Sequence, residues 1–336
     1  EATKDTTFEE CQVVNVTPKV RLLRFALIYG ANASGKSNLL NAMDFLRDFW
    51  FDKKSDIDEE TGVVPFLLDK ETPNEPSEFN IKFFVGDKRY WYALVLDDKQ
   101  VIKEDLYVYN SVQPSLVFSR ELDGTASLIK LNASLVKANA TIVEQLNVKC
   151  LSNMSFFAAR NQANCSLAYI DEVRDWMKNN MMPIIEPGTR MFEYAGKQME
   201  KNAELKAYIL DFVHKADYNI TDVYTEREKV PIPDFVKTSI MEDKDIPEKT
   251  KEKMLADNAL ERLRTDFQHT VKNKRGEENY RLPNSLQSEG TKRTFGIETA
   301  IYEAIKTNGI LPIDEIESSL HPELVEFIIE KFLKEK

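Results

Sequence analysis

The feature that most constrains the fold of this chain is the string GANASGKS at Gly30–Ser37, which has the phosphate-loop spacing G-x-x-x-x-G-K-[ST]. Glycines in such a loop allow backbone N–H groups to approach phosphate oxygens, while the lysine reaches the β and γ phosphates and the last hydroxyl coordinates Mg²⁺. Here these two side chains are Lys36 and Ser37. The spacing therefore predicts a nucleotide-binding turn between a strand and a helix.

The residues on either side of the loop have the pattern that this turn requires. Val20–Tyr29 is an apolar run typical of a buried strand, and Lys36–Trp50 has apolar residues at helical spacing. The N-terminus of that helix would add a partial positive charge where a phosphate binds. The apolar face expected on the helix comprises Leu39, Leu40, Met43, Leu46 and Phe49. The nucleotide-binding residues predicted from the loop are Gly30, Asn32, Ala33, Ser34, Gly35, Lys36, Ser37 and Asn38, with Lys36 also catalytic.

An acidic pair follows a short apolar run in ILPIDEIESSLHP at Ile310–Pro322. Asp314 is placed to hold Mg²⁺ through water, and Glu315 could polarise the attacking water as the catalytic residue. ATP and Mg²⁺ are therefore the predicted cofactors, with Ser37 and Asp314 binding the metal. The two acids could instead cap a helix, since Asp and Glu are common in first turns. Pro312 conflicts with a central strand because it has no N–H for the ladder, so we expect either a bulge or incomplete pairing there.

A third string, SLQSEGTKR at Ser285–Arg293, lies between these two and precedes an amphipathic segment. It resembles the ABC signature, in which a serine and a glycine open a helix, and the corresponding residues here are Ser288 and Gly290. Lys292 and Arg293 would reinforce the positive charge at the start of that helix. A serine and a glycine before a helix are on their own most often only a cap.

Together, the P-loop GANASGKSNLL, the signature QSEGTKR and the run IDEIESSLHP resemble those of the ABC-type AAA ATPases of bacterial abortive-infection and antiphage systems. This group includes the OLD-type ATPases, the ATPase subunits of Septu and its retron-linked relatives, and the ATPase of the PARIS system; SMC and RecF heads are more distantly similar. The resemblance implies an α/β fold, an ABC-ATPase-like P-loop head with an antiparallel β-subdomain and a helical insertion. It also implies that Ser288, Glu289 and Gly290 act in trans on the nucleotide of a second subunit, and that Ser319 and His321 lie in the D-loop.

The same resemblance implies a function. Such a head would form a homodimer or higher homo-oligomer through an ATP sandwich, hydrolyse ATP, and act as the sensor that controls a toxic effector protein, expected to be a nuclease. Two alternatives stay open: an OLD-type ATPase-nuclease whose TOPRIM domain is missing from this chain, and a RecF-like or SMC-like DNA-repair ATPase. The net charge of −11 does not indicate affinity for nucleic acid phosphates. No switch histidine or Q-loop is assigned, and we expect the sequence to be a piece of a longer protein.

The pattern along the chain predicts three parts. Residues 1–132 form the first half of the head, with the P-loop and a β-meander between Phe79 and Leu131, whose aromatic residues we expect to pack within the sheet. Residues 133–260 are expected to form a helical insertion, a lid or partner-docking surface, that ends in a highly charged helix or arm. Residues 261–336 form the second half of the head, which begins with a strand pair and is truncated before the switch histidine.

Composition narrows the class of protein. The 336 residues are 42% hydrophobic, enough for one large lobe with an insertion or for two modest domains. Three cysteines without C-x-x-C spacing suggest reduced thiols, and no apolar run approaches the roughly 18 residues that span a membrane. The scattered histidines argue against a zinc nuclease. We therefore expect a cytoplasmic protein with no membrane partner.

Overall fold

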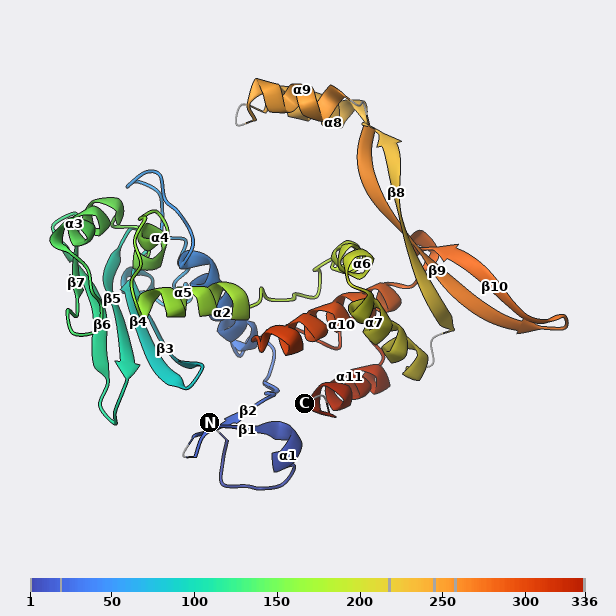
Figure 1. Cartoon of the computed structure of the whole chain (residues 1–336), viewed down its shortest axis with the longest axis horizontal. Coiled ribbons are helices and arrows are strands. Elements are labelled where there is room, and N and C mark those ends of the chain that lie inside the picture. Colours follow the sequence, from blue (N-terminus) through green and yellow to red (C-terminus); the bar gives the residue numbers. More distant parts are fainter. Residues whose placement is uncertain (1, 19, 217–218, 244–245, 257–258, 335–336) are drawn as a thin grey trace. The chain divides into compact units, whose positions relative to one another are not determined.

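The computed structural model describes the chain except residues 1, 19, 217–218, 244–245, 257–258 and 335–336 (Figure 1). The chain divides into two compact units. The first comprises Glu1–Ile185 and Thr307–Asp314, and the second comprises Glu186–Lys306 and Glu315–Glu335. The boundaries of these units differ from the predicted domain boundaries, which lie after residues 132 and 260. The three-part organisation stays a prediction.

The main sheet of the first unit is antiparallel and five-stranded, in the order β3-β4-β5-β6-β7. Its strands follow one another along the chain, so the predicted β-meander is confirmed. Gly124 has a φ of 64° in the turn after β6, a left-handed conformation that glycine adopts without strain. The strands are β3 (Ser77–Val85), β4 (Lys88–Leu96), β5 (Val101–Tyr109), β6 (Ser115–Asp123) and β7 (Ala126–Leu131).

Aromatic side chains of β4 alternate between the two faces of this sheet. Tyr90 and Tyr92 are fully buried, whereas Trp91 between them stacks on Tyr107 of β5 with ring centroids 4.7 Å apart. Trp50 is also fully buried and packs edge-on against Tyr92 at 4.8 Å. These rings serve sheet packing, as their period-two spacing predicts. The helices of this unit that contribute to the core are α2 (Lys36–Phe49), α3 (Ala140–Lys149), α4 (Phe156–Arg160) and α5 (Ile170–Asn180).

Arg120 of β6 and Glu104 of β5 form an ion pair with no exposed side-chain surface, at 3.3 Å. The Glu104 carboxylate also accepts hydrogen bonds from the Tyr92 hydroxyl at 2.9 Å and from the backbone N–H of Phe156 at 2.7 Å. Arg120 donates to three backbone carbonyls in the loop between α3 and α4. Burial raises the pKa of Glu104, and the Arg120 guanidinium opposes that shift. The network ties the loop to the sheet, and both charges have the partners that burial requires.

The second unit has a three-stranded antiparallel sheet in the order β10-β9-β8. Its central strand β9 (Ala259–Asn273) pairs with β8 (Ile220–Pro231) and with β10 (Gly276–Pro283), which confirms the predicted strand pair. β8 and β9 form an arm that carries α8 (Asp234–Glu242) and α9 (Glu248–Ala256) at its end (Figure 1). The other helices of this unit are α6 (Phe192–Lys201), α7 (Ala203–Lys215), α10 (Glu289–Thr307) and α11 (Pro322–Lys334).

The strand predicted at Val20–Tyr29 is wrong for most of its length. Only β2 (Val20–Leu23) is a strand, and it pairs antiparallel with β1 (Val13–Thr17). Residues 24–30 form no regular structure, and Tyr29 is 84% exposed. An apolar strand is buried when it has strands beside it and layers on both faces. No strand within the described ranges pairs with residues 24–30, and residues 26–30 are exposed.

The fold is thus mixed α/β with antiparallel sheets, as predicted, while the ABC-type head remains a prediction. The remaining short elements are α1 (Glu9–Gln12), η1 (Thr72–Asn74) and η2 (Asn284–Leu286).

Candidate nucleotide site

The loop Gly30–Ser37 closes on itself through its own polar groups. The Nζ of Lys36 donates to the carbonyl oxygens of Gly30 at 3.0 Å and of Ala31 at 2.9 Å. A Cβ added at Gly30 would lie 2.5 Å from the Oγ of Ser34, so the loop can close in this way only with glycine at that position or with Ser34 displaced. The ammonium group is therefore held beside the loop backbone, where phosphate oxygens would compete with the two carbonyls for it.

Two left-handed residues shape the turn that leads into α2. Gly35 is the N-cap residue with a φ of 88°, and Ala33 has a φ of 60°. Gly35 has no side chain to cap the helix, so the first N–H groups of α2 have no side-chain acceptor at the N-cap and can donate to an anion beside the positive end of the helix dipole. The predicted helix is confirmed, but its expected apolar face is not fully buried: Leu39 is 53% exposed, whereas Phe49 is buried.

The segment before the acidic pair forms a short parallel pairing. Bridges join the first residues and the last residues of Met181–Ile185 and Ile310–Ile313, so five residues on one side oppose four on the other. The extra residue lies in Met181–Ile185, opposite the segment that contains Pro312, and the pairing consists of two isolated bridges, so it is incomplete, one of the two outcomes expected from Pro312. The carbonyl of Pro312 accepts from the N–H of Ile185 at 3.0 Å, and the N–H of Asp314 then donates to the carbonyl of Ile185 at 2.9 Å. The hydrogen bonds at this end of the pairing therefore form without an N–H at Pro312.

Asp44 connects α2 to this pairing. Its carboxylate accepts from the backbone N–H of Ile184 at 3.2 Å and from the Arg47 guanidinium at 2.8 Å. The helix that begins in the P-loop is therefore joined, through Ile184, to the pairing that precedes Asp314 within the first unit.

The residues predicted to bind Mg²⁺ have the right donor chemistry. The Ser37 hydroxyl and the Asp314 carboxylate supply hard oxygen atoms, which Mg²⁺ prefers. In the part of the chain that the structure describes, no group of three or more His, Cys, Asp or Glu side chains could hold a metal ion alone. A bound Mg²⁺ would then complete its coordination with nucleotide phosphates and water, as this ion commonly does.

The predicted signature opens α10 in the second unit. The Ser288 Oγ accepts from the backbone N–H of Thr291 at 3.1 Å, so this serine caps the helix. Ser288 and Glu289 are both exposed. Lys292 forms an ion pair with Glu289 at 2.8 Å, and its charge is therefore partly neutralised rather than simply added to the helix terminus.

The backbone of the predicted D-loop passes directly against the signature. A Cβ added at Gly290 would lie 2.7 Å from the carbonyl oxygen of Ser319, which has a φ of 61°. The structure thus brings Gly290 and Ser319 together within the second unit. His321 precedes α11, its side chain is 72% exposed, and its Nδ1 lies 3.4 Å from the backbone nitrogen of Glu323 as an acceptor at the helix start. Its role in the D-loop stays a prediction.

Arg293 joins the signature helix to the acidic pair. Its guanidinium donates to the carbonyls of Glu186 at 3.3 Å, Pro187 at 3.0 Å and Glu315 at 3.2 Å. Burial lowers the pKa of Arg293, against the opposing effect of nearby carboxylates. The Arg293 guanidinium therefore binds backbone carbonyls, whereas the sequence predicted that it would add positive charge for an anion at the helix terminus. Sequence reasoning missed this role, because nothing in the string QSEGTKR shows which carbonyls an arginine will reach.

The predicted site residues are divided between the two units. The P-loop residues and Asp314 belong to the first unit, whereas Glu315, the signature and the D-loop residues belong to the second. The division passes between the two acids of the pair, and the catalytic and binding roles of these residues remain predictions.

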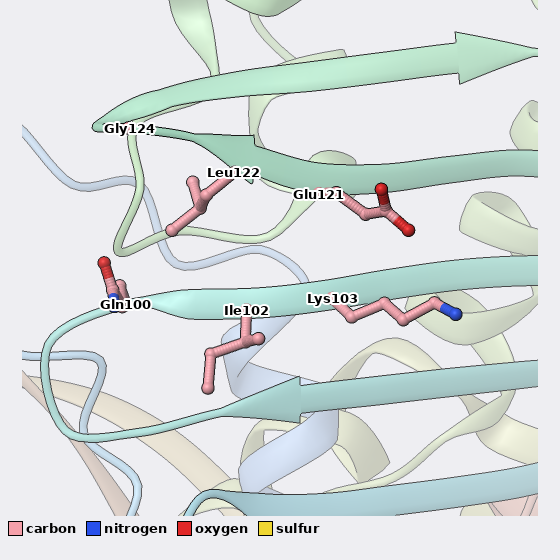
Figure 2. Close-up of a pocket in the computed structure, with 6 residues that line it drawn as sticks. All are labelled: Gln100, Ile102, Lys103, Glu121, Leu122 and Gly124. Atoms are coloured by element: carbon pink, nitrogen blue, oxygen red, sulfur yellow. The ribbon is translucent and has the colours of Figure 1, made fainter.

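The first unit also has a surface pocket, whose lining residues lie between positions 100 and 124 of the sequence. Figure 2 shows it over the neighbouring strands β5 and β6, where Lys103 and Glu121 are register partners. None of the predicted site residues lines it, so we do not assign the nucleotide to this pocket. Its lining residues are Gln100, Ile102, Lys103, Glu121, Leu122 and Gly124.

Comparison with known proteins gives one family-level result. A family model described as "AAA domain, putative AbiEii toxin, Type IV TA system" matches residues 25–130 and 194–336, which together make up more than half of the chain. The matched segments contain the P-loop, the signature and the acidic pair. No curated protein and no solved structure matches the chain. Among the described helices, none has both the length and the apolar character needed to cross a bilayer.

Proposed function

The chain belongs to this family of AAA-type P-loop ATPase domains of abortive-infection type, and on that basis we propose that it binds ATP with Mg²⁺, dimerises head to head through an ATP sandwich and hydrolyses the nucleotide. In the cell it acts as the sensor or regulatory subunit that controls a toxic effector, a nuclease, in antiphage defence. One observation carries the proposal. The residues that precede α2 and α10, Gly35 and Ser288, are both exposed, and the backbone N–H groups at such helix starts favour an anion.

In this proposal the residues of one copy hold the nucleotide. Lys36 exchanges the carbonyls of Gly30 and Ala31 for phosphate oxygens and gains stronger, charge-assisted hydrogen bonds. Ser37 and Asp314 hold Mg²⁺, which neutralises charge on the β and γ phosphates. Glu315 polarises the attacking water.

The second copy contributes its signature. Ser288 and the first turn of α10 face the γ-phosphate held by the partner subunit, so ATP joins the two copies. The close approach of Gly290 to the Ser319 carbonyl supports this arrangement, because it keeps the signature and the D-loop of one copy at a fixed separation.

The test is the mass of the Glu315→Gln protein in solution, measured by light scattering with and without ATP and Mg²⁺. This variant keeps the nucleotide ligands but loses the carboxylate that polarises water, so the ATP-bound dimer should accumulate and the mass should double. The matched control adds Ser288→Arg to the same variant, which should still bind ATP but remain a monomer. A mass that ATP does not change in Glu315→Gln contradicts the ATP sandwich.

Effector control is tested by expressing the chain with its neighbouring reading frames. A small protein that co-purifies and becomes toxic when Lys36 is replaced would support the sensor proposal. ATP-dependent DNA binding by this chain alone would instead favour a RecF-like or SMC-like role.

A further inference from the structure

The strongest observation that the proposed function leaves unused is the set of contacts made by Arg293. This residue lies in the second turn of α10, five positions after Ser288. Its guanidinium donates to Glu186 and Pro187 on one segment and to Glu315 on another. These two segments directly follow the last bonded residues of the parallel pairing, in which the N–H of Asp314 donates to the carbonyl of Ile185. Arg293 therefore holds both chain segments at the point where they leave that pairing.

The backbone at Glu315 has a conformation that needs support. Its φ is 44°, in the left-handed region that a residue other than glycine rarely adopts. The Glu315 carbonyl accepts a hydrogen bond from the N–H of Ser318 at 2.8 Å as well as from Arg293. The direction of the Glu315 side chain depends on this turn, because the Cα–Cβ bond is fixed relative to the backbone. We therefore expect a change at Arg293 to alter the backbone of Glu315 and, with it, the direction of the Glu315 side chain.

Only arginine can make this set of contacts. Its planar guanidinium has five donors in a fixed arrangement, and NH1 and NH2 here reach three carbonyls on two segments. A lysine at the same position has one ammonium group at a single point and cannot span both segments in the same way. The contacts are thus a property of the arginine side chain and not simply of its charge.

We propose that Arg293 is a positioning residue that couples the signature of a subunit to the catalytic carboxylate of the same subunit. The inference rests on the proposed function and deepens it. When the N-terminus of α10 engages the nucleotide of the partner subunit, the helix shifts as a rigid element and Arg293 carries the shift to Glu315. Occupancy of one ATP site then sets the rate of hydrolysis at the other.

The experiment compares wild-type protein with Arg293→Lys in steady-state ATP hydrolysis over a range of ATP concentrations. Since the variant keeps the charge but not the three contacts, kcat should fall by roughly 10-fold to 100-fold, the range expected when a catalytic group is misplaced by about 1 Å. KM for ATP should stay within about twofold, because the three carbonyls that Arg293 holds belong to Glu186, Pro187 and Glu315, which are not among the residues predicted to bind the nucleotide. The proposed coupling also predicts that the rate of wild-type hydrolysis depends sigmoidally on ATP concentration and that this dependence is lost in the variant. The Arg293→Lys, Glu315→Gln double variant should still double its mass with ATP.

The matched control is Arg281→Lys, the same chemical change on β10. Arg281 stacks on the Tyr224 ring at 3.8 Å and pairs with Glu226 at 3.3 Å, and both Arg281 and Glu226 are exposed. Because these partners both lie on β8, kcat and the ATP dependence of Arg281→Lys should match those of wild type. If Arg293→Lys does not fold, Arg293→Gln replaces it in the same comparison, since one amide can still donate to a single carbonyl.

Two results would overturn the coupling. One is a folded Arg293 variant whose kcat and ATP cooperativity equal those of wild type. The other is a variant in which ATP binding, dimerisation and turnover all fall together, as expected if Arg293 only stabilises the unit. Wild-type protein that neither hydrolyses ATP nor dimerises with it would instead refute the proposed function, and the two failures are therefore distinguishable.

Discussion

Replacing Gly290 with alanine tests the contact between the signature and the predicted D-loop. The added Cβ would lie 2.7 Å from the Ser319 carbonyl oxygen, whereas ordinary van der Waals contact begins at 3.4 Å. The obstructing atom belongs to the backbone, and the neighbouring φ of 61° at Ser319 is already unusual for a residue other than glycine. We therefore expect the Ser319 backbone to move by several tenths of an ångström away from α10.

The expected loss of stability follows from two opposing effects. Overpacking of this kind typically costs about 1–3 kcal/mol in the free energy of unfolding. Alanine has a better helix propensity than glycine by up to about 1 kcal/mol, which offsets part of that cost. The net expectation for Gly290→Ala is a destabilisation of about 1–2 kcal/mol, together with weaker ATP-dependent dimerisation because Ser319 and Ser288 no longer keep their separation.

The assay is denaturant unfolding of the nucleotide-free protein, followed by light scattering of the Gly290→Ala, Glu315→Gln double variant with ATP and Mg²⁺. Gly188→Ala is the control, since nothing lies within 4 Å of a Cβ at Gly188 and the expected change is within about 0.5 kcal/mol. If Gly290→Ala unfolds and dimerises like the Gly188 control, then the close approach has no mechanical consequence and the reasoning is wrong.

Three further predictions concern the loop, the buried ion pair and a tyrosine. Lys36→Ala should abolish ATP binding, because it removes the ammonium group that meets the phosphates; a fluorescent-nucleotide titration that matches wild type would contradict this. Arg120→Met should cost about 3–5 kcal/mol in unfolding free energy by leaving the Glu104 carboxylate buried without its cation, and adding Glu104→Leu should recover part of that loss in the same denaturation assay. Burial, with a hydrogen bond to Glu303, raises the pKa of Tyr194 from 10.0 to about 12. The neutral phenol is therefore favoured in the folded state, so this contribution to stability is present below pH 10 and is lost as the pH rises through about 12. Tyr194→Phe should make the alkaline unfolding curve flatter, and an unchanged curve would count against the assignment.

Local patterns in the sequence predicted the elements whose burial is decided nearby. The five strands of the meander each pair with the next strand along the chain, so alternation and turn residues were sufficient. The helix α2 begins at the glycine and lysine of the loop, and α10 begins at the serine and glycine of the signature. Pro312 predicted either a bulge or incomplete pairing, because a missing N–H must be accommodated in any pairing, and the pairing is incomplete.

The prediction failed where burial depends on a distant partner. The apolar run before the P-loop has the composition of a central strand, but composition cannot show whether another strand pairs with it. In this structure the segment 24–30 has no strand beside it among the described residues, and Tyr29 lies at the surface.

The sequence by itself determined the residue types that a phosphate and Mg²⁺ require, since the spacing of Gly30, Gly35, Lys36 and Ser37 depends only on the geometry of one short loop. Only the tertiary structure decided which backbone groups these motifs meet. Gly290 approaches Ser319, and Arg293 reaches carbonyls from two segments that are far apart in the sequence. Such contacts arise because α10 packs against segments that are distant from it in the sequence. A local sequence pattern cannot predict them.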